Sequence, residues 1–494
     1  MMLNSLSSAY SELRARYLSP AIEKRLVFSL IILATVACSA ALAYRLAAPL
    51  SSSPVLIVLF PIALAVFFVV VIRHDLVLLG IIALRATIDP VLEIYKQTNG
   101  FGPGAAINAM ILLLMFITIV RRPVPLLRGS VLIWLPFLVL AAIAIGDSPD
   151  PARGIRMLML YVSYMSLYAM PIALINNRAD ARRFVLVLLA ASIIPTVGGF
   201  FDIARGGLSV ADPDDPELDE NSDLAVADYG GFRIQGVFSH PNICAMFLVA
   251  MATALLYMIK SRLFKWTALQ RIALYAYLVM QLALLVATQT RSAWAAAFFV
   301  FLVYGVFVER KFLIYMAAAL PTMLLWPPIQ DRLAEAIFGM QMRANDQMTS
   351  YAWRVEMWRA AIPWIQEKWL SGWGLDSYTD YSAIFFLLEY KRAYDAHNLF
   401  IQLAFEIGIP GVLAFIAIFF WLIAAALRSF PHARLESVLI AASCVGFLMI
   451  SYSDNVHRYL VSNWYLFFML GTLSAITWLP RRTRYRVRTE KPPP

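Results

Sequence analysis

The sequence predicts an all-α polytopic membrane protein. Of its 494 residues, 61% are hydrophobic and only 15% are charged, whereas soluble domains average about 45–50% apolar and roughly 25% charged residues. The apolar residues form continuous runs rather than alternating ones. Because a helix satisfies its backbone hydrogen bonds internally, such runs cross a bilayer as helices and not as barrel strands.

We expect a bundle of about 12–14 transmembrane helices, since one span needs about 20 mostly apolar residues. The segments 75–87 and 106–120 are short enough to be partial or re-entrant spans. The candidate spans lie near residues 26–45, 54–72, 75–87, 106–120, 130–146, 154–175, 184–203, 237–259, 272–288, 293–308, 312–326, 398–427, 435–453 and 463–478.

The distribution of Lys and Arg predicts the orientation. Basic segments such as RRPVPLLR, NNRADARR and RRTRYRVRTEK fall on one side of the alternating spans, which makes that side cytoplasmic and places both termini there. The formal net charge of +10 belongs to these loops, so a nucleic-acid partner is excluded and the lipid bilayer is the expected partner surface.

Two long loops are expected on the outer side, at 205–236 and 327–396. The first is acidic at its centre, ADPDDPELDENSD. In the second, SYAWRVEMWRAAIPWIQEKW predicts amphipathic helices on the membrane face, with four tryptophans at interface depth: Trp353, Trp358, Trp364 and Trp369. The glycines of SGWGLDSY are expected to end this helical stretch.

The unusual polar residues gather on the outer side. No Walker loop, GxGxxG or HExxH motif is present, the histidine spacings suggest no metal site, and the three cysteines lie in apolar runs. Arg233, Arg291 in the turn QTRSAW, and Arg354 run against the positive-inside bias. A guanidinium fork suits diphosphate oxygens; the alternative for Arg291 is a side chain that snorkels to the interface.

The stretch AHNLFIQLAFEIGIPG combines polar side chains with the start of an apolar run. His397 is a candidate to orient or deprotonate a hydroxyl, or else a helix-start residue bonded to a loop carbonyl. Glu406 follows nine residues later and points to nearly the opposite side of a straight helix, so we expect it to brace a loop or pair with an arginine. The glycines and proline of GIPG predict a helix break.

These motifs resemble the O-antigen ligase/polymerase superfamily of bacterial membrane glycosyltransferases. The resemblance rests on FRIQGVFSHPN, QTRSAW, a large outer loop with WRVEMW and GWGLDSY, and AHNLFIQLAFEIGIPG. It implies a GT-C-like helical bundle in the bacterial inner membrane with its active site on the periplasmic face. It also divides the chain into an N-terminal bundle (1–236), a ligase-like catalytic region (237–427) and C-terminal helices with a basic tail (428–494).

The resemblance further implies transfer of a glycan from a polyprenyl diphosphate carrier to a sugar hydroxyl, without metal or other cofactor. Arg233, Arg291 and Arg354 would hold the diphosphate, and His397 with Arg291 would be catalytic. Supporting roles fall to Asn398, Glu406, Gly408 and Gly411. The acceptor is a glycan or a lipid A–core, and the motifs do not separate a ligase from a polymerase. A transporter or flippase of a lipid-linked sugar is the alternative function.

Overall fold

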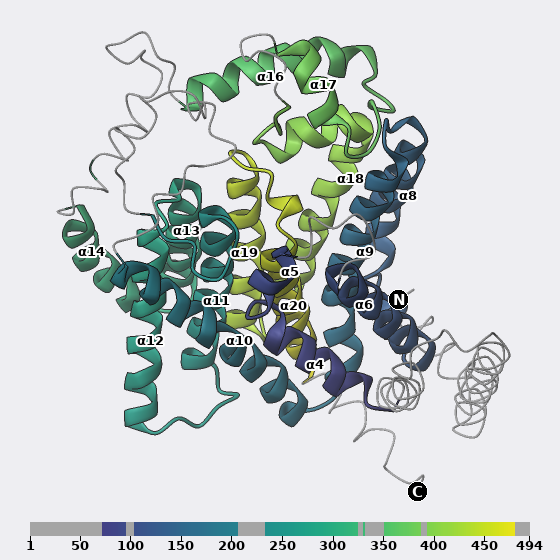
Figure 1. The fold of residues 1–494 in the computed structure, drawn as a ribbon. Helices are drawn as coiled ribbons and strands as arrows, with labels where there is room; N and C mark the ends of the chain where they lie inside the picture. The colour runs from purple at the N-terminus through teal and green to yellow at the C-terminus, as the bar shows by residue number, and fades with distance from the viewer. Residues whose placement is uncertain are drawn as a thin grey trace, which may run out of the picture.

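The computed structural model describes residues 72–94, 103–205, 233–324, 330, 350–386 and 393–479. Within these ranges the regular elements are all helices (Figure 1), which confirms the predicted all-α class. The spans expected at 26–45 and 54–72, most of the acidic loop 205–236, the first part of the loop 327–396 and the basic tail lie outside the described residues.

Eight of the described helices are long and apolar enough to cross a membrane. The helix at the expected span 106–120 has 19 residues and is long enough to cross a membrane, whereas α4 (His74–Arg85) has only 12. The eight are α6 (Pro103–Arg121), α9 (Pro151–Leu174), α10 (Arg178–Ala204), α11 (Pro241–Lys260), α12 (Ala268–Ala287), α18 (Leu399–Ser429), α19 (Arg434–Ser451) and α20 (Leu460–Thr477).

Shorter helices fill the spaces between these spans. An apolar stretch at Leu132–Asp147 contains α8 (Leu135–Ala144), and α13 (Arg291–Phe307) is also apolar. The remaining ones are α5 (Asp89–Ile94), α7 (Val124–Leu127) and α14 (Lys311–Leu324), with 3-10 turns η1 (Leu132–Trp134), η2 (Ile145–Asp147) and η3 (Val456–Arg458).

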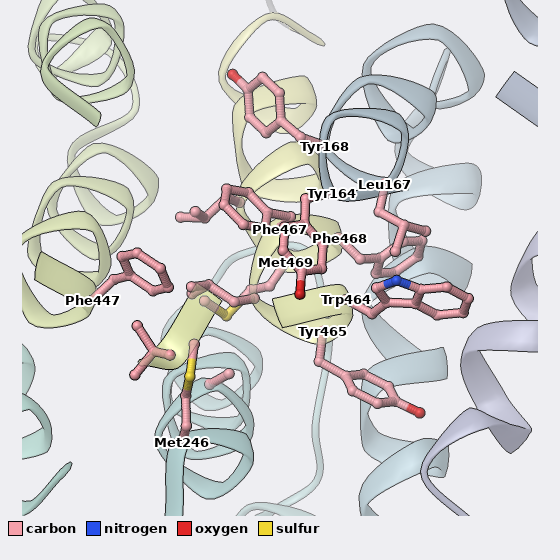
Figure 2. Packing of buried hydrophobic residues seen from close by; sticks show 14 of the residues in the cluster. Tyr164, Leu167, Tyr168, Met246, Phe447, Trp464, Tyr465, Phe467, Phe468 and Met469 are labelled. Atoms are coloured by element: carbon pink, nitrogen blue, oxygen red, sulfur yellow. The ribbon is translucent and has the colours of Figure 1, made fainter. Parts of the chain in front are cut away.

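The centre of the bundle is α20, which is enclosed mainly by α9, α11 and α19 (Figure 2). Its helix contact with α9 is close because a β-carbon on Gly471 would lie 2.2 Å from the carbonyl oxygen of Tyr168. Small residues permit such approach between membrane helices. The same pair of helices is joined by a hydrogen bond from the Trp464 indole to the Ser163 hydroxyl, at 2.9 Å.

Two helices lie beyond one end of the bundle, α16 (Ser350–Glu367) and α17 (Tyr378–Phe385), seen at the top of Figure 1. We call this the site end. The spans α9, α11, α18 and α20 begin there, and α10, α12 and α19 end there, as the hydrogen bonds between their termini described below require. The helix α18 runs from the outer helices down into the bundle (Figure 1).

Two of the four tryptophans expected at interface depth are covered by protein. Trp353 is buried against the rings of Phe386 and Tyr394, at centroid distances of 5.3 and 5.0 Å. Trp358 is buried and donates its indole N–H to the carbonyl of Ala396. These two rings therefore form the core between α16 and the chain leading into α18, because a buried indole supplies both apolar area and a donor.

Candidate functional site

The predicted residues Arg233 and Arg291 lie on adjoining segments at the site end. Arg233 donates from Nε to the carbonyl of Thr288 at 3.1 Å, and the backbone N–H of Ile234 donates to the carbonyl of Ala287. These bonds fix the segment before α11 against the turn between α12 and α13. Arg291 is the first residue of α13 and follows that turn directly.

The amide of Asn242 links this pair of segments to a third. Its Oδ1 accepts from Nη2 of Arg233 at 3.2 Å and from the Thr290 hydroxyl at 3.1 Å. Its Nδ2 donates to the Asp454 carboxylate at 2.8 Å. Asp454 belongs to the loop 453–458 between α19 and α20, so one side chain joins three connections that are far apart in the sequence.

Arg354 contacts the same loop from the outer helices. Its Nη1 donates to the carbonyl oxygen of Ser453 at 2.9 Å. The side chain is half-buried on α16. Because a guanidinium has five donors, this bond to a single carbonyl fixes the position of Arg354 without using its whole hydrogen-bonding capacity.

His397 adopts a left-handed backbone conformation, with a φ of 46°. Only a well-held neighbourhood maintains this conformation at a residue other than glycine. Here the preceding residue is bonded on both sides: the N–H of Ala396 donates to Oε1 of Gln402 at 2.9 Å, and its carbonyl accepts from Trp358. After it, Asn398 caps α18 by accepting from two backbone N–H groups. The imidazole is half-buried beside the ring of Trp353.

Buried side chains below His397 form a second polar group. Gln402 accepts from the Asn455 amide at 2.9 Å and donates to Glu406 at 2.7 Å. Oε1 of Glu406 lies 3.8 Å from Nη2 of Arg458. The structure therefore pairs Glu406 with an arginine of the 453–458 loop.

Arg458 is held among three carboxylates. It makes ion pairs with Asp376 and with Asp395, the latter at 3.0 Å, in addition to Glu406. Burial opposes its charge, but these three groups raise the pKa of Arg458 further above its ordinary value. Burial raises the pKa of Asp376 despite the opposing effect of Arg458. One cation cannot neutralise three anions, so the protonated form of a carboxyl group, as at Asp376, is favoured.

Charge in this region also acts on two neighbouring residues. Burial works against the ionised form of Asp395, yet the charge of Arg458 above all holds the pKa of its carboxyl below the usual value. Burial, followed by the charge of Arg458, lowers the pKa of His457 to about 3. Its ring is therefore neutral, and it stacks on Tyr161 at a centroid distance of 6.1 Å.

The helix break predicted at GIPG is confirmed at Gly408, whose φ of 78° and ψ of 174° are not helical. Pro410 has no N–H, so the carbonyl of Glu406 would have no donor in a continuous helix. The N–H of Gly374 donates to it instead, at 3.1 Å, and the N–H of Trp373 donates to the carbonyl of Phe405. On the other side of the break, the N–H of Ile409 donates to the carbonyl of Trp369.

The GWG loop, residues 369–375, thus replaces the missing turn of α18. It fits there because a β-carbon on Gly372 would lie 2.4 Å from the backbone carbon of Glu406, and one on Gly408 would lie 2.6 Å from the backbone of Leu370. Gly411 lies in the helix after the break, against the Ile407 side chain. The glycines of SGWGLDSY end the outer helix as predicted.

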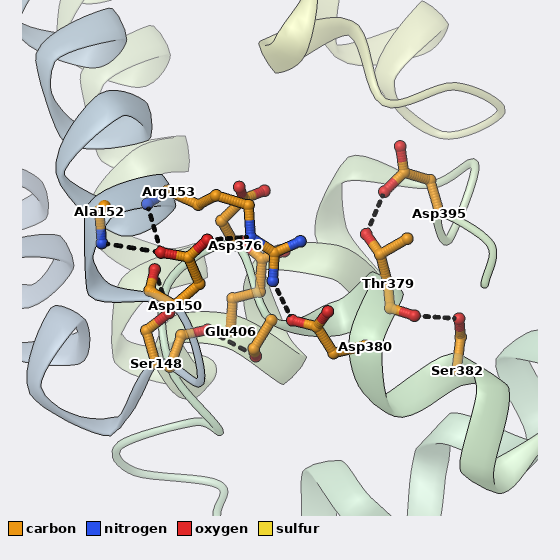
Figure 3. A network of polar contacts seen from close by, with 12 residues as sticks. Ser148, Asp150, Ala152, Arg153, Asp376, Thr379, Asp380, Ser382, Asp395 and Glu406 are labelled. Carbon is orange, nitrogen blue, oxygen red and sulfur yellow. Dashed lines mark hydrogen bonds and ion pairs between the residues drawn. The ribbon is translucent and has the colours of Figure 1, made fainter. Parts of the chain in front are cut away.

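The same loop holds the outer helices on α8 and α9. The N–H of Leu375 donates to the carbonyl of Ala144 at 3.0 Å. Figure 3 shows the side-chain part of this attachment, in which Arg153 at the start of α9 pairs with Asp150 and with Asp380 of α17. The outer helices are therefore bound to the bundle at several points.

The loop 453–458, SDNVHR, was not predicted as part of the site, although it contacts Arg354, Asn242 and Gln402. Two signals in the sequence pointed to it: a run of polar residues between two apolar spans, and an arginine on the side that the positive-inside rule depletes. The participation of Asp376 and Asp395 had no such signal. In the described part of the chain, no cluster of three His, Cys, Asp or Glu side chains is arranged to hold a metal ion.

The helices and the polar end together define a polytopic helical membrane protein with its candidate site at one end of the apolar spans. Residues 276–416 match the family model described as O-antigen ligase. The match includes Arg291, Arg354 and His397, and it supports membership of the O-antigen ligase/polymerase superfamily. No curated protein matches the chain.

Proposed function

We propose that this protein transfers a glycan from a polyprenyl diphosphate carrier to a sugar hydroxyl at the periplasmic face of the bacterial inner membrane, as a metal-independent O-antigen ligase or polymerase. The product would belong to lipopolysaccharide or exopolysaccharide. The observation that carries the proposal is that three of the expected site segments are tied to one loop, 453–458. Arg354 contacts this loop directly, Arg233 is linked to it through Asn242, and the chain before His397 is linked to it through Gln402.

The arginines suit a departing diphosphate. As the bond from the anomeric carbon to the carrier oxygen breaks, negative charge grows on the diphosphate, and arginines already in place stabilise that charge without reorganisation. Arg233 and Arg354 each donate to a backbone carbonyl, which fixes their positions. Arg291 starts a helix, and the N-terminal end of a helix dipole also favours an anion.

His397 suits the acceptor. The acceptor oxygen attacks the anomeric carbon and loses its proton, and an imidazole is the usual group to take it. Asp395 lies two residues away and interacts electrostatically with His397. Its negative charge stabilises the positive charge that the ring gains with the proton. The rigid backbone on both sides of His397 supports a positioning role for the ring.

The test compares surface polysaccharide from a strain lacking the gene after complementation with wild type, His397→Ala or Arg291→Ala. We expect both variants to lose transfer by at least about a hundredfold, the scale of a general base or an anion-stabilising donor. His432→Ala is the matched control, because His432 is exposed at the opposite end of α18. Normal glycan in both site variants would contradict the proposal.

The phenotype of the deletion strain without complementation distinguishes a polymerase from a ligase. Loss of a polymerase leaves single repeat units attached to their acceptor, whereas loss of a ligase leaves finished polymer on the carrier. If the deletion strain delivers no lipid-linked sugar to the periplasmic face, and both site variants are active, the protein would instead be a flippase.

A further inference from the structure

We infer that Asn242 is a positioning residue, which holds the Arg233 guanidinium in the orientation that binds the donor diphosphate; this rests on the proposed function. The amide makes hydrogen bonds to three segments at once, as described above, and Arg233 is the cationic partner among them.

The chemistry of the partners fixes the orientation of the amide. Arginine can only donate hydrogen bonds, so Oδ1 must face Arg233. The carboxylate of Asp454 can only accept, so Nδ2 must face Asp454. The opposite orientation would place donor against donor and acceptor against acceptor, which is costly for half-buried groups. The side chain therefore has one satisfactory arrangement.

Asn242 and Asp454 are themselves well held. The side chain of His240 accepts from the backbone N–H of Asn242 at 3.1 Å, which fixes the first turn of α11. Asp454 accepts from the Tyr459 hydroxyl at 2.6 Å and from the backbone N–H of Asn455. Arg233 is thus positioned through a chain of contacts that ends on α11 and on the loop before α20.

A neutral partner is the suitable one for this role. A carboxylate at position 242 would bind Arg233 as an ion pair and would compete with the diphosphate for the guanidinium. An amide oxygen orients the arginine through a hydrogen bond without placing a second negative charge beside the guanidinium. The negative charge of Asp454 is separated from Arg233 by the length of the amide group.

The geometry allows an exchange test. In Asn242→Asp, two carboxylates would face each other across the present 2.8 Å contact. In the double variant Asn242→Asp with Asp454→Asn, the donor and acceptor are reversed, so every hydrogen bond of the site has a partner again. Arg233, Thr290 and Tyr459 can keep their present bonds in that variant.

The measurement is binding of polyprenyl diphosphate without a glycan to the full-length protein in lipid nanodiscs, with thermal unfolding recorded for each variant. Asn242→Ala and Asn242→Asp are expected to weaken binding roughly tenfold, the scale of one charge-assisted hydrogen bond. The double variant is expected to regain the unfolding temperature lost in Asn242→Asp but not the binding, because it keeps a carboxylate beside Arg233. Polyprenyl monophosphate should be affected less by every variant, because it offers fewer oxygens to the guanidinium.

A matched control comes from the opposite end of the bundle. The Asn177 amide also donates to an aspartate, Oδ2 of Asp180 at 3.0 Å, at the start of α10. Asn177→Asp should leave diphosphate binding unchanged. An equal effect of Asn177→Asp and Asn242→Asp would mean that the loss reflects general destabilisation, and would overturn the inference.

The remaining outcomes separate the inference from the proposed function. If Arg233→Ala binds the diphosphate lipid as well as wild type, the role of the arginine fails and the inference fails with it. If Arg233→Ala loses binding while Asn242→Ala and Asn242→Asp retain it, only the positioning role is wrong. A double variant that binds the diphosphate lipid as well as wild type would show that a carboxylate at position 242 serves equally well, and would contradict the role of the neutral amide.

Discussion

The substitution Gly372→Ala tests how the GWG loop completes the broken helix α18. Gly372 has a φ of 72°, and an alanine there costs about 1–2 kcal/mol from the left-handed conformation alone. Its β-carbon would also lie 2.4 Å from the backbone carbon of Glu406. Backbone cannot rotate away as a side chain can, so the loop and the helix must separate.

Separation breaks hydrogen bonds as well. Three backbone bonds cross this contact, from Trp373, Gly374 and Ile409 to carbonyls on the other side, and each contributes about 1 kcal/mol. We therefore expect Gly372→Ala to lower the free energy of unfolding by roughly 4–5 kcal/mol, the sum of the conformational cost and the lost bonds.

Gly129→Ala is the matched control. Gly129 has the same φ of 72°, but its β-carbon would meet only the Trp421 side chain at an ordinary 3.7 Å. This variant should lose only the conformational 1–2 kcal/mol. Denaturation in mixed micelles, followed by tryptophan fluorescence, measures both. Equal losses in the two variants would show that the contact with α18 contributes nothing and would refute the reasoning.

Three further predictions concern the buried groups. Arg458→Met should cost about 3 kcal/mol of unfolding free energy because three carboxylates lose their cation, whereas Arg73→Met, at the exposed pair with Asp75, should cost less than about 1 kcal/mol; equal costs would contradict the pairing. The lowered pKa of His457 means that the unfolded chain binds more protons between about pH 6.5 and 3. As the pH falls through that window, the free energy of unfolding should therefore decrease by up to about 1.4 kcal/mol per pH unit. The decrease should be shallower in His457→Phe, and parallel pH curves for the two proteins would show that His457 does not cause it. Gly471→Ala, 2.2 Å from the Tyr168 carbonyl, should destabilise by about 1–3 kcal/mol, while Gly446→Ala, with contacts no closer than 3.5 Å, should not; thermal unfolding distinguishes them, and a similar shift for both would argue against close packing of α9 and α20.

The helical class and most of the described spans followed from the sequence because hydropathy and backbone satisfaction in lipid are local properties. The break in α18 was predictable for the same reason, since Gly408 and Pro410 act within one turn. Local patterns did not predict how the tryptophans of α16 pack. They have the spacing of an interfacial helix, yet Trp353 and Trp358 are buried against protein. A sequence pattern does not state whether lipid or another helix covers an aromatic face.

The partners of the polar residues could not be predicted. Asn242 and Asp454 are separated by 212 positions, and nothing local to either residue indicates the other. A pairing of Glu406 with an arginine was expected because Glu406 lies on the side of the helix away from His397. That the partner is Arg458 depends on how α18, α19 and α20 meet at the site end. Such contacts are set by packing of the whole bundle, which no window of sequence contains.

The GWG loop has a practical consequence for exchanging parts between relatives. Residues 399–407 of α18 are hydrogen-bonded to the GWG loop, whereas the residues after Gly408 continue as a span. A chimera that replaces only the outer loop would therefore join a foreign loop to a native helix end across the three shared backbone bonds. Exchange of 350–409 as one cassette, with its joint inside the span, keeps those bonds within a single parental sequence.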